Sequence, residues 1–197
     1  MDHISILKTV ASQNGGIIST KAAEAGGMSR AMLSILNKQG KIRRIARGQY
    51  ILANDIEDDL LSIDIRSDNI VFSHETALWL HGISDRTPFV HSITVPTGKM
   101  PSRAIRDECK IYYIKPELFE LGRATLQTPY GNTVSAYDLE RTICDCVRSR
   151  NKMGSETFLA ALKAYAARKD KNLNLLYDYA TKLRISGVLR QYLEVLL

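Results

Sequence analysis

The chain has 197 residues and a mass of 22.1 kDa, with 45% hydrophobic residues, 24% charged residues, 12 Gly and 5 Pro. This composition excludes disordered, collagen-like and coiled-coil proteins and indicates a globular protein of one large domain or two small ones. No stretch approaches the roughly 20 apolar residues that span a bilayer, and residues 1–16 lack the layout of a signal peptide, so we expect a cytoplasmic protein without membrane contact.

The positive charge is concentrated at the start of the chain. The net charge is +6, and residues 1–53 carry all of this excess, with eight basic residues against Asp2 and Glu24. The basic residues are Lys8, Lys21, Arg30, Lys38, Lys41, Arg43, Arg44 and Arg47. Such a segment favours a polyanion as its partner. The acidic run at 54–59 follows at once, and we place a domain boundary there, which gives domains 1–53 and 54–197.

The first domain has the pattern of three helices and a hairpin. The apolar spacing from Ile4 to Ala11 predicts a helix that ends at residues 14–16. Ser19 or Thr20 caps a short second helix over 21–25, and Ser29 caps a third that runs to about Gln39. Residues 41–45 and 49–52 read as two strands with a tight turn between them. Three helices followed by a β-hairpin predict a winged helix-turn-helix.

The second domain mixes strands and helices. Ser73 is positioned to cap a helix over 74–82, and 91–96 and 110–114 alternate like strands. Residues 125–134 resemble a hairpin, and Ser135 and Asp138 have the spacing of a capping box. Amphipathic helices are expected over 155–168, 173–183 and 187–197. The predicted fold class is therefore α+β, a winged helix-turn-helix followed by a small sheet with a helical tail.

The third helix of the first domain carries the polar pattern expected of a recognition helix. Arg30, Ser34 and Asn37 lie opposite the apolar side chains of Met32, Leu33 and Leu36, where Arg suits guanine and Asn suits adenine in the major groove. Cations on the hairpin suit phosphates or the minor groove. The predicted DNA-binding residues are Lys21, Ser29, Arg30, Ser34, Asn37, Lys38, Lys41, Arg43, Arg44 and Arg47. A helix-turn-helix can also contact protein, so the sequence favours DNA without excluding a protein partner.

Few other residues suggest chemistry. His74 and His81 lack the spacing of a metalloprotease helix and are interpreted as packed or capping side chains. We therefore predict no catalytic, cofactor-binding or metal site and no enzymatic activity.

The polar and thiol side chains of the second domain are given structural roles. Glu140, Arg141 and Asp145 on one helix suit a surface ion-pair network better than a catalytic dyad. The cysteines fit neither a disulfide framework nor zinc spacing and are interpreted as reduced core thiols. They are Cys109, Cys144 and Cys146.

Several segments together resemble the AbiEi-type antitoxins of bacterial abortive-infection systems. The segments are SRAMLSILNKQGKIRRIARGQYIL at 29–52, SHETALWLHGIS at 73–84, ITVPTG at 93–98 and DLERTICD at 138–145. The resemblance implies an antitoxin of a type IV toxin-antitoxin pair that gives phage resistance. It implies repression of its own operon by binding inverted repeats in the promoter, as a monomer that binds double-stranded DNA cooperatively. It also implies action against a nucleotidyltransferase toxin of the AbiEii type, without necessarily a stable complex, through unidentified residues within 54–197.

Two alternatives remain for the second domain. It can be a sensor that makes the chain a ligand-responsive winged-helix regulator, although no pocket motif is visible. It can also be an enzyme acting on a nucleotide or nucleic acid, with Glu140 or Asp145 as the residues to test.

Overall fold

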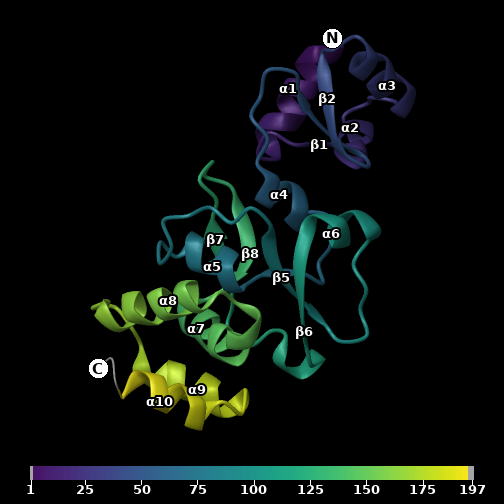
Figure 1. Cartoon of the computed structure of the whole chain (residues 1–197). Helices are drawn as coiled ribbons and strands as arrows, with labels where there is room; N and C mark the ends of the chain where they lie inside the picture. Colours follow the sequence, from purple (N-terminus) through teal and green to yellow (C-terminus); the bar gives the residue numbers. More distant parts are fainter. Residues whose placement is uncertain (1, 195–197) are drawn as a thin grey trace. The chain divides into compact units, whose positions relative to one another are not determined.

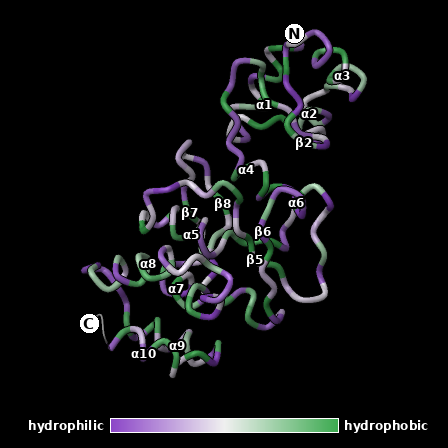
Figure 2. Tube along the Cα trace, viewed as in Figure 1, coloured by the Kyte–Doolittle hydropathy of each residue, from purple (hydrophilic) through white to green (hydrophobic). Residues whose placement is uncertain are grey.

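The computed structural model describes residues 2–194, which form two compact units (Figure 1). Unit 1 comprises Met1–Arg66 together with Thr128–Asn132, and unit 2 comprises Ser67–Gln127 and Thr133–Leu197. Hydrophobic stretches recur through the helices and strands of both units (Figure 2). No helix in the described part of the chain is long and apolar enough to cross a membrane.

Unit 1 is a winged helix-turn-helix. Its elements are α1 (His3–Gln13), β1 (Ile18–Ser19), α2 (Thr20–Ala25), α3 (Arg30–Lys38), β2 (Ile42–Ala46), β3 (Gln49–Leu52) and α4 (Asp59–Asp64). The strands form an antiparallel sheet in the order β1-β3-β2. Helix α1 begins after Asp2, whose carboxylate accepts the Ile4 N–H, and ends at Asn14. The three helices and the hairpin follow the predicted order.

Unit 1 extends beyond residue 53. Helix α4 buries Leu60, Leu61 and Ile63, and the Ser62 hydroxyl donates to the buried Gln49 side chain of β3 at 3.1 Å. The acidic run that marks the expected boundary therefore leads into a helix of the same compact unit. The functional division into a DNA-binding and an antitoxin domain stays a prediction.

A second segment of the chain completes unit 1. The carboxylate of Asp58, the N-cap of α4, accepts the Thr128 hydroxyl at 2.6 Å and the Asn132 amide at 2.8 Å. The same Asn132 amide lies 3.3 Å from the Gly15 carbonyl. Asp58 is buried, so these bonds replace the water that its charge would otherwise need.

Unit 2 is a five-stranded mixed sheet with helices. Its elements are β4 (Val71–Phe72), α5 (His74–Leu80), β5 (His91–Pro96), α6 (Arg103–Glu108), β6 (Cys109–Ile114), η1 (Pro116–Leu118), β7 (Arg123–Gln127), β8 (Thr133–Tyr137), α7 (Leu139–Arg148), η2 (Arg150–Lys152), α8 (Ser155–Ala167), α9 (Leu173–Lys182) and α10 (Ser186–Leu193). The strand order is β6-β5-β4-β8-β7, in which β5–β6 and β4–β8 are parallel. This small sheet with a helical tail confirms the predicted α+β class. Residues 195–197 of the last predicted helix lie outside the described residues.

Helix α7 is the centre of the unit 2 core. Each of its residues from Leu139 to Val147 is buried. Helices α8, α9 and α10 surround it, and their apolar side chains join those of α5, β4 and β8 in one cluster (Figure 1). The cysteines are buried and free, as predicted for core thiols.

Two predicted caps are wrong. Ser73 precedes α5 but does not cap it, because its hydroxyl instead bonds the His74 ring and the Thr94 hydroxyl, each at 2.9 Å. Ser135 lies within β8, and Asp138 alone caps α7 by accepting the Arg141 N–H at 2.8 Å. In a capping box the first residue is the N-cap and the second lies in the first turn of the helix. Strand β8 continues to Tyr137, so Ser135 cannot be the N-cap of α7.

The predicted surface ion-pair network is buried. Arg141 and Asp145 have side chains 0% exposed, with Arg141 Nε 3.0 Å from Asp145 Oδ2, and Arg148 lies 3.4 Å from the other oxygen of Asp145. Glu140 is also buried and accepts the Asn172 N–H at 2.8 Å. Arg141 and Asp145 have the i, i+4 spacing expected of an ion pair, but the packing of α8 and α9 around α7 shields this pair from water.

The two histidines are packed, as expected. His74 has a backbone φ of +48° and stacks on Tyr112 with ring centroids 3.4 Å apart. Its Nε2 lies 3.0 Å from the Ser149 hydroxyl. His81 bonds the Tyr137 carbonyl through Nε2 at 2.8 Å. Both rings serve the packing of unit 2.

Candidate nucleic-acid interface

Helix α3 is held by its two ends and by one apolar face. Ser29 caps its start by accepting the Met32 N–H at 3.2 Å, and Gly27 supplies the turn before it with a φ of +86°. Leu33 and Leu36 are buried in the unit 1 core. The side of α3 that carries Arg30, Ser34 and Lys38 is therefore left in solvent.

Arg30 lies at the first position of α3 and is bonded to Glu24 of α2. Its Nε is 2.7 Å from Glu24 Oε1, and its Nη2 is 3.4 Å from Oε2. The hydrogen bond and charge of Glu24 raise the pKa of Arg30 above its ordinary value. The guanidinium is thus oriented by a carboxylate from the preceding helix.

Asn37 is placed differently from the other residues predicted to read bases. It is half-buried, and its Oδ1 accepts the backbone N–H of Arg44 at 3.0 Å. A paired contact to adenine N6 and N7 needs this oxygen as an acceptor. In this arrangement Asn37 ties α3 to β2, and reading adenine would require that bond to be exchanged.

The wing is a tight hairpin with cations near its tip. Strands β2 and β3 are joined through Arg47 and Gly48, where Gly48 has a φ of +75°, and the register shifts between Arg44 and Ala46. The Thr20 N–H and hydroxyl both bond the Gly48 carbonyl, at 2.8 and 3.1 Å. Helix α2 therefore fixes the position of the wing tip.

Arg30, Arg44 and Arg47 line one hollow of about 440 Å³ between α3 and the wing. Thr20, Leu33, Gly48 and Tyr50 complete its lining. The guanidinium groups of Arg44 and Arg47 give this space a positive potential suited to a phosphodiester, whereas Arg30 is paired with Glu24. Thr20 and Tyr50 are members that sequence reasoning did not include, because only the folded hairpin brings α2 and β3 beside α3.

The remaining predicted DNA-binding residues lie outside this hollow. Arg43 pairs with Glu57 at 3.4 Å, and the Ser29 hydroxyl is used as a cap. Lys21, Lys38 and Lys41 are exposed, and none of the three forms an ion pair with a described residue. These side chains are available to phosphates.

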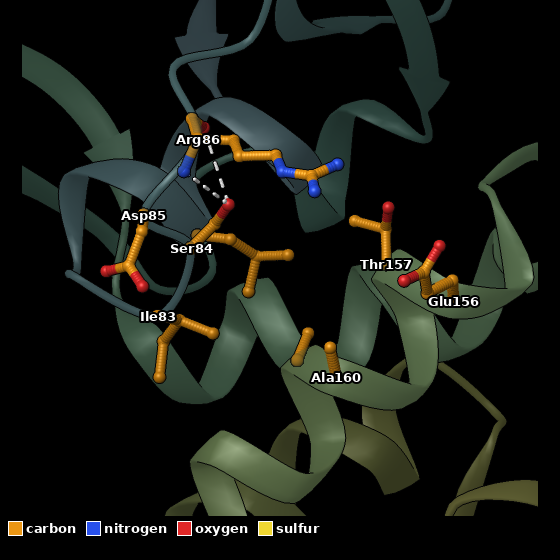
Figure 3. Close-up of a pocket in the computed structure, with 9 residues that line it drawn as sticks. Ile83, Ser84, Asp85, Arg86, Glu156, Thr157 and Ala160 are labelled. Carbon is orange, nitrogen blue, oxygen red and sulfur yellow. Dashed lines mark hydrogen bonds between the residues drawn. The ribbon is translucent and has the colours of Figure 1, made fainter.

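Unit 2 has two adjoining hollows on its surface, of about 280 and 410 Å³. Both are lined by Leu78, Ser84, Arg86 and Thr157. Figure 3 shows the Arg86 side chain on the loop side of the smaller hollow, facing Thr157 on α8. In residues 2–194 no group of three or more His, Cys, Asp or Glu side chains is arranged to hold a metal ion.

The chain is similar to a family model and to a solved structure. No curated protein matches the chain. The crystal structure of the RV2827C protein from Mycobacterium tuberculosis is similar, with a TM-score of 0.69 and 16% identity over 98% of this chain and 78% of that chain. At this identity the similarity concerns the fold alone. Residues 5–53 match the family model described as "Transcriptional regulator, AbiEi antitoxin". The predicted resemblance is thus confirmed for this segment of the chain.

Proposed function

We propose that this chain binds inverted repeats in its own promoter, represses its operon and acts as the antitoxin of a type IV toxin-antitoxin pair. The observation that carries the DNA-binding half is the hollow lined by Arg30, Arg44 and Arg47 beside the exposed face of α3. Helix α3 enters the major groove with Arg30 and Ser34 toward the bases. The wing cations contact phosphates, which gives affinity and orientation.

The first test is a band-shift titration of the full chain against the DNA upstream of its own gene, with scrambled DNA as competitor and varied salt. Specific retardation supports autoregulation. Equal affinity for scrambled DNA contradicts it and makes the basic unit a general polyanion or protein contact.

Replacing Arg47 with Ala tests the wing. We expect weaker binding to every DNA sequence and a salt slope lower by about one, because one phosphate contact is lost. The control is Arg103→Ala in α6, where the side chain is 87% exposed, since it changes the net charge of the chain equally. If Arg47→Ala keeps the wild-type affinity and slope, the wing does not contact phosphates.

The antitoxin half rests on the match of residues 5–53 to the AbiEi antitoxin family model and is tested by co-expression. The chain and the Arg47→Ala variant are each expressed with a nucleotidyltransferase toxin of the same operon, and growth is measured. We expect both to restore growth when a foreign promoter drives them, because we place antitoxicity within residues 54–197. Growth arrest with the wild-type chain contradicts the antitoxin assignment.

A ligand-responsive regulator is the second candidate function, and the two adjoining hollows of unit 2 are the observation that favours it. Release of the chain from its operator by the small-molecule fraction of a cell extract supports this candidate. Loss of that release in an Arg86→Ala variant assigns the effect to the hollows. If the small-molecule fraction leaves the band shift of the wild-type chain unchanged, the ligand-responsive candidate is rejected.

A further inference from the structure

The contact between Glu24 and Arg30 links the two helices of the helix-turn-helix. Glu24 lies near the end of α2 and Arg30 is the first residue of α3, on either side of a turn whose Met28 is buried in the core. Their side chains are 42% and 76% exposed, so neither is removed from solvent by packing. The pair therefore lies on the surface where α3 would meet DNA.

The two bonds use one particular edge of the guanidinium. Glu24 accepts from Nε at 2.7 Å and from Nη2 at 3.4 Å, which is the side-on edge. An arginine has five N–H donors, so both Nη1 donors and the second Nη2 donor remain. These donors form the end-on fork, which is still able to make a paired contact.

We propose that Glu24 is a positioning residue that turns the free fork of Arg30 toward guanine in the operator; this rests on the proposed function of α3 as the base-reading helix. Guanine presents two acceptors, O6 and N7, to the major groove, and the fork matches both. Adenine presents a donor at N6 and is rejected. The carboxylate also repels phosphates, so Arg30 gains less from binding DNA of any sequence.

The experiment is a double-mutant cycle on the full chain, with its own upstream DNA and scrambled DNA as probes. The proteins are wild type, Glu24→Gln, Arg30→Ala and the double variant. We expect Glu24→Gln to bind scrambled DNA more tightly and to lower the preference for the operator roughly tenfold, within the discrimination of one paired base contact. In the Arg30→Ala background the same change should no longer lower that preference.

A second readout identifies the base atom. Operator DNA with 7-deazaguanine, which lacks the N7 acceptor, should bind wild type more weakly at one guanine position and bind Arg30→Ala unchanged there. The matched control is Glu57→Gln. Glu57 is 31% exposed and pairs with Arg43, so this substitution removes the same charge and leaves the Glu24–Arg30 ion pair intact. It should keep the wild-type preference for the operator.

Three results overturn the inference. If Glu24→Gln binds the operator more tightly and its preference for the operator over scrambled DNA is unchanged, Glu24 only competes with DNA for Arg30 and does not position it. An equal loss of preference in both backgrounds means that Glu24 does not act through Arg30. Wild-type protein that binds scrambled and upstream DNA alike overturns the proposed function itself, and this result is distinct from the other two.

Discussion

Replacing Asp145 with Ala is expected to lower the free energy of unfolding by about 3–5 kcal/mol, because it leaves the buried Arg141 guanidinium without its counter-ion. Arg141 is 0% exposed and its Nη1 also bonds the Leu118 carbonyl at 2.9 Å, so it cannot reach water without breaking the core. The measurement is urea denaturation of the full chain, followed by far-UV circular dichroism.

The matched control for Asp145 is Asp178 on α9. It pairs with Lys182 at the same i, i+4 spacing, 2.7 Å apart, but both side chains are 51% exposed. Asp178→Ala should therefore change the free energy of unfolding by only about 0.3–0.5 kcal/mol. Equal effects of the two substitutions would show that burial of the Arg141 pair contributes nothing.

Acidification is expected to destabilise the protein through His74. Burial lowers the pKa of His74 well below its ordinary value, and the charges of Arg148, Lys110 and Arg141 lower it further. Above a pH of about 6.5 the ring is neutral in both states and contributes no pH dependence. Below it, the unfolded chain binds a proton that the folded chain does not, so the free energy of unfolding falls by about 1.4 kcal/mol per pH unit from this group.

The test compares the pH dependence of urea denaturation in wild type and His74→Asn. Asn tolerates the positive φ at this position, so the variant keeps the backbone while removing the titrating group. Its slope below pH 6.5 should be smaller by the contribution of His74. A wild-type slope in His74→Asn would assign the acid sensitivity to other groups.

The sequence predicts those parts of unit 1 that local signals determine. Ser19 and Ser29 cap helices where expected, and the Arg47–Gly48 turn joins the two strands of the wing. These features depend on neighbours within a few residues. The polar face of α3 follows from the same periodicity, so most of the candidate interface could be named from the sequence.

Contacts between separate elements could not be predicted in the same way. The pattern of Arg141 and Asp145 is the same for an exposed and a buried helix, and only the helices packed around α7 decide the difference. Glu24 lies six residues before Arg30, across a turn, where no helical spacing relates them. The Asn37 bond to Arg44 joins α3 to the edge strand β2, and no local sequence pattern relates the two residues.

Because unit 1 is built from two separate stretches of the chain, the order of synthesis matters for its folding. A ribosome releases Asp58 long before Thr128 and Asn132, the residues that bond its carboxylate. Until β7 has been made, that carboxylate has only water and the start of α4 for partners. Unit 1 is therefore complete only after residue 132 has emerged from the ribosome. Nascent chains that stop earlier should hold the helices of unit 1 in a state that is more easily cleaved by protease than the finished protein.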